Sequence, residues 1–297
     1  MDPTVPWRML RYYLEHPLGR RDRLRTLMRI VRWQLGSRLL GARVAVPIVD
    51  GARLLVGTGM HGATGNVYVG LMEFEDMAFV LHFMREDDEF LDVGANVGVY
   101  SILAASRGAR VLAMEPVPDT YEQLLDNIHL NRFQERIEAR RVGIGKGAGE
   151  LRFSIGSGPT NHVLAPGEST DHSLTVGVDT LDAIAAGSAP TMLKIDVEGF
   201  EANVIAGAAG LLAQQSLQAV LIELNGLGSR YGFSDADIHA SLLDFGFRPV
   251  SYEPFARRLV ALDEHNSSGN TLYVRPSVAL AQRLQETPAA RAIGVSV

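Results

Sequence analysis

The 297-residue chain contains no cysteine. This absence excludes disulfide bonds, thiolate metal sites and a cysteine nucleophile. No stretch approaches the ~20 consecutive apolar residues of a transmembrane helix, and no apolar signal-peptide segment follows Arg8 and Arg11, so we expect a globular protein in the cytoplasm. Lysine is also scarce: among 28 basic residues only Lys146 and Lys194 are lysines. Because nearly all basic residues of this chain are arginines, each lysine suggests a position where arginine cannot replace it.

The net charge of −6 is unevenly distributed. Residues 1–43 hold ten arginines against three acidic residues, a net charge of +7, whereas the remainder holds 18 basic and 31 acidic residues, a net charge of −13. The acidic remainder argues against a nucleic-acid partner. For the basic segment we favour packing against the rest of the protein. The alternatives are a contact in a possible homodimer or a substrate lid, and peripheral docking on an anionic membrane through Trp7, Tyr12 and Tyr13.

Strand and helix patterns alternate along most of the chain. Such alternation predicts a mostly parallel sheet covered on both faces, a Rossmann-like α/β fold. We expect a basic helical and hairpin cap over residues 1–85, the main domain over 86–276 with an antiparallel hairpin at one sheet edge, and a tail over 277–297 that is a polar helix or disordered. The expected strands are 43–49, 53–57, 90–93, 110–114, 137–142, 150–156, 173–178, 192–195, 219–224, 247–252 and 271–274, and the expected helices are 7–40 (interrupted at Pro17 and Gly19), 73–84, 99–106, 119–130, 179–186, 201–214 and 234–245.

A glycine-rich segment follows the first strand of the main domain and opens a helix. It runs from Leu91 to Gly98 with the sequence LDVGANVG. Gly94 and Gly98 let the backbone turn sharply and approach a ligand, and Asp92 places a carboxylate where a ligand ammonium could sit. Glu115 ends the next strand, 23 residues after Asp92, a position suited to hydrogen bonds with both hydroxyls of a ribose.

These features favour S-adenosylmethionine over a dinucleotide. The dinucleotide fingerprint requires glycine at two positions that Asn96 and Val99 occupy here, and a pyrophosphate needs the close approach that those glycines permit. An NAD-linked oxidoreductase therefore remains only an alternative. A protein that binds S-adenosylmethionine without catalysis is a second alternative.

A second motif reads Leu-Lys-Ile-Asp-Val-Glu-Gly-Phe-Glu from Leu193 to Glu201. Lys194, Asp196 and Glu198 alternate along a strand and therefore share one face. Three charges on one face of a buried strand are costly unless that face meets a ligand or a cleft. Their position near the glycine-rich segment predicts a reaction site.

Here the sequence resembles the FkbM family of methyltransferases. The resemblance rests on the glycine-rich segment, on Glu115-Pro116, on the run from Lys194 to Gly199, on Glu223 and on residues 270–274. It implies a seven-stranded methyltransferase sheet, S-adenosylmethionine as methyl donor and a hydroxyl group as the usual acceptor, on a polyketide, a sugar or another natural-product intermediate. We accordingly expect O-methylation of a small hydroxylated molecule.

The expected site falls into three groups. The donor-binding residues are Glu73, Asp92, Gly94, Ala95, Asn96, Gly98, Glu115, Pro116, Val142, Gly143 and Asp196. The candidates to bind or deprotonate the acceptor are Lys194, Asp196, Glu198 and His162, the last from a Gly/Pro/Ser-rich insert over 156–173 that could close as a lid and that also holds His172. If a metal such as Mg²⁺ is bound, Asp196 and Glu223 are its expected ligands.

Overall fold

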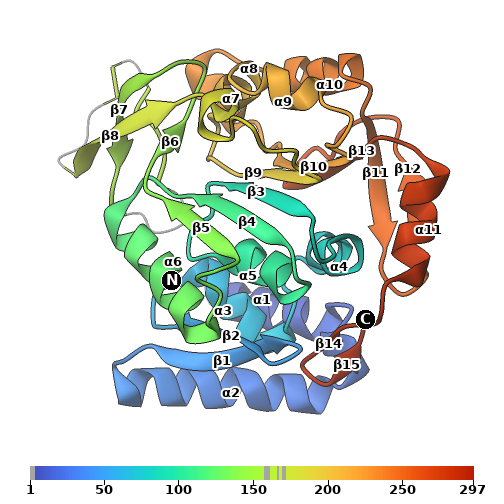
Figure 1. Ribbon diagram of the computed structural model, residues 1–297. Helices are drawn as coiled ribbons and strands as arrows, with labels where there is room; N and C mark the ends of the chain where they lie inside the picture. The colour runs from blue at the N-terminus through green and yellow to red at the C-terminus, as the bar shows by residue number, and fades with distance from the viewer. Residues whose placement is uncertain (1–3, 157–160, 166, 169–171) are drawn as a thin grey trace.

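The computed structural model describes residues 4–156, 161–165, 167–168 and 172–297 (Figure 1). A central sheet organises the molecule. Its eight strands are, in spatial order, β12 (Arg258–Ala261), β11 (Arg248–Glu253), β13 (Asn270–Val274), β10 (Ala219–Glu223), β9 (Met192–Ile195), β3 (Glu89–Val93), β4 (Arg110–Met114) and β5 (Ile137–Arg140). The five strands from β10 to β5 are parallel, and β13 runs antiparallel between β10 and β11.

Helices cover both faces of this sheet (Figure 1). One face carries α7 (Leu181–Ile184), α8 (Glu201–Ala206), α9 (Ala209–Ala213) and α10 (Asp235–Asp244), and the other carries α4 (Phe74–Phe83), α5 (Val99–Ser106) and α6 (Pro118–Asn131). Because β9 and β10 are buried between two helical layers, their sequences MLKI and AVLIE are almost continuously apolar. Lys194 is the exception in β9, and its burial requires a partner.

The strand order reverses beside β3. The chain adds β4 and β5 on one side of β3, and later adds β9 and β10 on its other side. Ligands of doubly wound sheets bind in the crevice that such a reversal opens at the carboxyl ends of the strands. The topology alone therefore directs attention to the ends of β3 and β9.

The N-terminal region forms a layer of its own, here called the cap. It comprises α1 (Thr4–Glu15), the 3₁₀ helix Gly19–Arg21, α2 (Arg23–Leu40), β1 (Val44–Val49), β2 (Ala52–Val56) and α3 (His61–Val69). The end of the chain returns to it: after α11 (Val278–Glu286), strands β14 (Arg291–Ala292) and β15 (Val295–Ser296) extend the hairpin into a sheet of order β15-β14-β1-β2. Both ends of the chain thus contribute to one layer.

A smaller sheet flanks the carboxyl ends of the central strands. It has the order β6-β8-β7 and consists of β6 (Gly143–Ile144), β8 (Ser173–Asp179) and β7 (Gly149–Ser154). A 3₁₀ helix, Leu227–Tyr231, follows β10. Part of the predicted lid, residues 157–160, 166 and 169–171, lies outside the described residues.

The predicted Rossmann-like α/β class is confirmed, with several differences in detail. Strand β12 was not predicted; it forms the edge hairpin with β11, and the antiparallel β13 lies inside the sheet. Helix α3 was also missed, because its sequence HGATGNVYV has two glycines and no apolar stripe. The predicted helix over 201–214 is interrupted at Gly207, where a Cβ would lie 2.0 Å from the carbonyl oxygen of Gly145. The expected tail is packed: Leu280 and Leu284 of α11 are buried.

Candidate functional site

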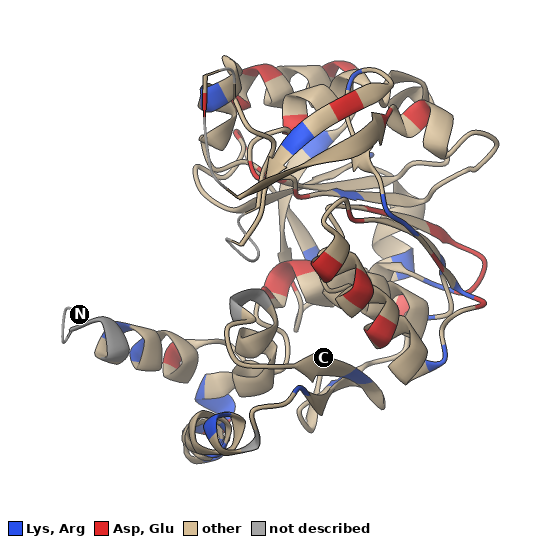
Figure 2. Ribbon diagram, turned by 90° about the vertical axis from the view of Figure 1, so that its left-hand side faces the viewer, with Lys and Arg blue, Asp and Glu red and all other residues tan. Residues whose placement is uncertain are grey.

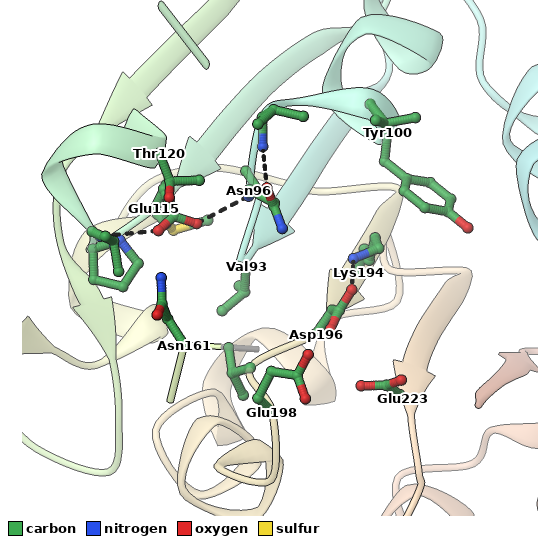
Figure 3. A pocket seen from close by; sticks show the side chains of 18 of the residues that line it. Val93, Asn96, Tyr100, Glu115, Thr120, Asn161, Lys194, Asp196, Glu198 and Glu223 are labelled. Atoms are coloured by element: carbon green, nitrogen blue, oxygen red, sulfur yellow. Dashed lines mark hydrogen bonds and ion pairs between the residues drawn. The ribbon is translucent and has the colours of Figure 1, made fainter. Parts of the chain in front are cut away.

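A cavity of about 510 Å³ opens at the carboxyl ends of β3, β4, β9 and β10. Figure 3 shows its polar side chains pointing inward from these strand ends. The cap contributes Met60 to the wall, the residue before α4 contributes Glu73, and the insert contributes Asn161 and Val163. The cavity therefore lies at the reversal point of the strand order, between the central sheet and the two segments outside it.

The turn after β3 (Gly94–Gly98, the glycine turn) depends on its glycines. Gly94 has φ 75°, and a Cβ there would lie 1.8 Å from the carbonyl oxygen of Asp196. Gly98 has φ 86° and is the N-cap residue of helix α5. Asn96 adopts φ 52°, a left-handed conformation that asparagine tolerates better than most residues. Its side-chain Oδ1 accepts a hydrogen bond from the Val97 amide at 2.8 Å, which stabilises the turn.

Glu115 follows β4 and lies directly beside this turn. Its two carboxylate oxygens accept hydrogen bonds from the Asn96 amide at 3.0 Å and the Val117 amide at 2.9 Å. Only 6% of the residue is exposed, and burial raises the pKa of its carboxyl to about 7. A buried carboxylate of this kind favours additional hydrogen-bond donors from a ligand, and a pair of vicinal hydroxyls supplies them.

Asp92 lies below the cavity and does not line it. The residue is fully buried, and the Ser101 hydroxyl donates to its Oδ2 at 2.6 Å. Its Oδ1 has no partner among the described residues. Burial raises the pKa of Asp92, and the nearby Lys194 ammonium opposes that shift. The expected ammonium-binding position is therefore not at the cavity surface, and Asp92 faces a cation of the protein instead.

Lys194 contributes a buried, positively charged ammonium group to the cavity wall. It is 3% exposed, and its Nζ lies 2.9 Å from Asp196 Oδ2 and 4.9 Å from the centre of the Tyr100 ring. Burial lowers its pKa, but the carboxylates of Asp196 and Asp92 more than offset that effect and hold the pKa above its usual range. Lys194 therefore cannot accept a proton; it compensates the acidic charges around it.

Three carboxylates converge opposite the glycine turn: Asp196, Glu198 and Glu223, here called the carboxylate cluster (Figure 3). One oxygen from each lies within 4.8 Å of the others. Burial, followed by repulsion from Asp196 and Glu198, raises the pKa of Glu223 to about 8. Neighbouring like charges of this kind cannot all ionise easily, so the cluster retains a proton near neutral pH. Once ionised, the Glu223 carboxylate can accept a proton, and the cluster is also suited to bind a cation.

The Glu201 side chain stabilises the backbone segment that carries Asp196 and Glu198. Glu201 is 3% exposed, and its Oε1 accepts hydrogen bonds from the amides of Val197 at 3.2 Å and Gly199 at 3.0 Å. Glu198 itself has φ 55°, a conformation that costs free energy and is found at functional sites. Glu201 thus stabilises a strained turn that aims Glu198 into the cavity.

The remaining predicted residues divide into two groups. Ala95, Pro116, Val142 and Gly143 line the cavity, as does Glu73, which accepts a 2.7 Å hydrogen bond from the Tyr100 hydroxyl. His162 does not line it: its Nε2 lies 3.0 Å from Glu168 Oε1 and its Nδ1 lies 3.3 Å from Ser154 Oγ. His172 is likewise absent from the wall, and so is the predicted donor-binding residue Gly98, which shapes the turn without lining the cavity.

Several wall residues were not predicted. They include Tyr100, Thr120, Asn161 and three methionines of the N-terminal region, Met60, Met72 and Met77. Tyr100 follows the glycine turn by two residues, which was the one available signal in the sequence. Met60 precedes α3, and Met72 and Met77 lie before and within α4; no local pattern indicates how these helices lie relative to the sheet.

Comparison with known proteins places this site in a family context. The model of the methyltransferase FkbM domain matches residues 92–249, slightly more than half of the chain. The hexuronic acid methyltransferase AglP of Haloferax volcanii is 30% identical over 156 residues, 52% of this chain and 62% of that protein. The methyltransferase sdnD of Sordaria araneosa is 28% identical over 132 residues, 42% of this chain and 49% of that protein. The match thus spans less than two thirds of either relative.

A solved structure of the same description is also similar. Methyltransferase FkbM from Methylobacillus flagellatus KT has 16% sequence identity and a TM-score of 0.42, over 82% of this chain and 59% of that chain.

Proposed function

The chain belongs to the FkbM methyltransferase family, and from this premise we propose that it transfers a methyl group from S-adenosylmethionine to a hydroxyl oxygen of a small molecule. The observation that carries the proposal is the placement of the glycine turn, Glu115 and the carboxylate cluster around one cavity. One side is suited to a nucleoside, and the other is suited to a group that loses a proton.

The glycine turn and Glu115 fit the nucleoside part of the donor. Gly94 lines the cavity, and Gly98 lets the turn pack closely because a Cβ there would lie 2.5 Å from Leu124 Cδ1. The Glu115 carboxylate lines the same cavity and would accept hydrogen bonds from the ribose hydroxyls. Val142 and Gly143 would border the adenine with backbone groups. When bound, S-adenosylmethionine supplies an electrophilic methyl group on a positively charged sulfur.

The carboxylate cluster fits the proton chemistry. As the acceptor oxygen forms its bond to the methyl carbon and the carbon–sulfur bond breaks, the hydroxyl proton passes to a carboxylate. Glu223, whose pKa is raised to about 8, is a better proton acceptor than an ordinary carboxylate. Lys194 holds Asp196 at 2.9 Å and limits the repulsion within the cluster.

The charge of the cavity favours a neutral or cationic acceptor. Glu73, Glu115 and the carboxylate cluster line it, while Lys194 is the single basic side chain among the lining residues that the structure describes. AglP is named for a hexuronic acid, which is an anion near neutral pH. We expect this chain to prefer an uncharged polyhydroxylated molecule, because like charges repel strongly in a confined site.

The test is turnover with S-adenosylmethionine carrying a labelled methyl group and a panel of neutral sugars and hydroxylated polyketides. We expect the label in an O-methyl ether, in amounts that Asp196→Ala reduces. Label on a nitrogen atom would overturn the assignment of the acceptor. Donor binding without turnover of any acceptor, unchanged by Asp196→Ala, would instead support a non-catalytic role.

A divalent cation is the alternative occupant of the carboxylate cluster, since Mg²⁺ prefers oxygen ligands. In our proposal the cluster takes the proton directly, so turnover persists after divalent cations are removed with EDTA. Loss of turnover that Mg²⁺ restores would transfer the role of the cluster to the metal.

A further inference from the structure

Helix α2 carries a long apolar stripe that nothing in the described structure covers. Its members, spaced at three or four residues, are 38–86% exposed: Leu24, Leu27, Met28, Val31, Leu35 and Leu39. The opposite face packs on the cap through buried Thr26 and Ser37 and the partly buried Ile30 and Trp33. Six exposed aliphatic side chains in one row exceed the scattered apolar residues of an ordinary surface.

Arginines border this stripe, and no acidic residue interrupts it. Helix α2 contains Arg23, Arg25, Arg29, Arg32 and Arg38 and no aspartate or glutamate. Arg29 points inward and donates to the Tyr68 carbonyl at 2.8 Å; the other four are exposed. The neighbouring α1 adds exposed Trp7 and Tyr12. Figure 2 shows the basic residues along these N-terminal helices, apart from the acidic residues of the body.

A second copy of the chain is a poor occupant for this surface. Symmetric pairing of two α2 stripes would bring two rows of arginines together without acidic partners, and like charges at an interface are unfavourable. An anionic lipid surface, in contrast, satisfies both features at once. Apolar side chains enter the boundary between headgroups and acyl chains while arginines contact phosphates.

We propose that α1 and α2 dock the protein peripherally on a bilayer rich in anionic phospholipid, with the α2 stripe facing the lipid. No helix in the described part of the chain is long and apolar enough to cross a bilayer. The helix lies along the lower edge of the molecule, with the rest of the cap between it and the central sheet (Figure 1). The acidic body therefore faces away from the lipid.

The docked surface is connected to the cavity through one helix. Tyr68 of α3 accepts the Arg29 bond and a 2.7 Å hydrogen bond from Gln34, both from α2. Ala63 of the same helix lines the cavity. Helix α3 therefore joins the lipid-facing helix α2 to the wall of the cavity. The docking proposal itself does not depend on the reaction that the cavity performs.

The test is co-sedimentation of the full chain with vesicles of phosphatidylcholine alone or of phosphatidylcholine and phosphatidylglycerol in equal amounts. We expect binding to the anionic vesicles that weakens with salt. The triple variant Arg23→Gln, Arg25→Gln, Arg32→Gln should lose on the order of 100-fold in partitioning. The variant Leu24→Gln, Val31→Gln, Leu35→Gln should lose binding as well. Val278→Gln, an exposed apolar position on α11, is the matched control and should bind as the parent does.

Tryptophan fluorescence gives an independent readout. Trp33→Phe leaves Trp7 as the single tryptophan, and its emission should shift to the blue on anionic vesicles. Equal binding to neutral vesicles, or none to anionic ones, would overturn the proposal. A stable dimer in analytical ultracentrifugation that the Leu24/Val31/Leu35 variant abolishes would assign the stripe to a second copy instead.

Discussion

The glycine turn and the carboxylate cluster line one cavity but are built in different ways. The turn is formed by consecutive residues, and Gly94 and Asn96 hold its shape through their own backbone conformations. The cluster brings together Asp196 and Glu198 from the end of β9 and Glu223 from the end of β10, and it relies on Lys194 and Glu201 for support. The comparison shows that a turn can be shaped by consecutive residues while the acidic cluster beside it depends on two neighbouring strands of the sheet.

The largest effect on donor affinity is expected at the turn itself. Gly94→Ala places a Cβ 1.8 Å from the Asp196 carbonyl oxygen at a φ of 75°. Calorimetry should show donor affinity reduced by on the order of 100-fold or more. Gly147→Ala, where a Cβ meets no atom within 4 Å, is the control and should bind like the parent. Normal affinity in Gly94→Ala would show that the turn is not the donor site.

In the carboxylate cluster, Glu223→Gln should slow methyl transfer without changing the affinity for the donor. Removal of a general base lowers kcat by roughly 10²–10⁴-fold, whereas donor affinity should stay unchanged because Glu223 lies away from the turn. Since the carboxylate accepts the proton only when ionised, kcat of the parent should rise as pH rises through about 8. The variant should lack this dependence. A parallel loss of donor affinity would contradict the division of the cavity into two sides.

A comparison of neutral and anionic acceptors tests the role of the carboxylate cluster in the parent protein, without any substitution. A neutral hexose derivative and the matching hexuronate differ in one carboxylate, which would meet Glu73 and the carboxylate cluster. We expect kcat/KM to be at least about 10-fold lower for the hexuronate. A preference for the hexuronate would show that the negative charges of the cavity are neutralised when the acceptor binds.

The smallest effect is expected for a residue that does not line the cavity. His162→Gln alters a residue that pairs with Glu168 and does not line the cavity, so kcat should change by less than about twofold. Asn161→Ala, one residue earlier and within the wall, serves as the comparison. A large loss in the histidine variant would restore His162 as a candidate base.

Local features were predicted well from the sequence. The glycine turn, Glu115 and the helix after Ser234, whose side chain accepts from the Asp237 amide, all follow from short-range rules about backbone conformation and capping. Lys194, Asp196 and Glu198 were expected to alternate along one strand, but only Lys194 lies in β9, which ends at Ile195. All three line the cavity, and their part in the reaction stays a prediction. These predictions needed only a few neighbouring residues each.

The parts that could not be predicted depend on distant contacts. Strand β14 pairs with β1 at Val49 and Ala292, residues more than two hundred positions apart. Tyr100 reaches Glu73 only because α4 of the N-terminal region packs beside α5. His162 was expected as a base from its chemistry, but its partner Glu168 lies within the same insert. Residue type and spacing carry no information about these arrangements.

The most direct test of the account is calorimetric titration with S-adenosylmethionine, S-adenosylhomocysteine and NADH of the parent, Glu115→Ala and Glu122→Ala, the last an exposed control on α6. The account predicts micromolar binding of both sulfur nucleosides to the parent and the control, loss of that binding in Glu115→Ala, and no binding of NADH. Binding of NADH in their place, or equal affinity in Glu115→Ala, would contradict the assignment of this cavity to S-adenosylmethionine.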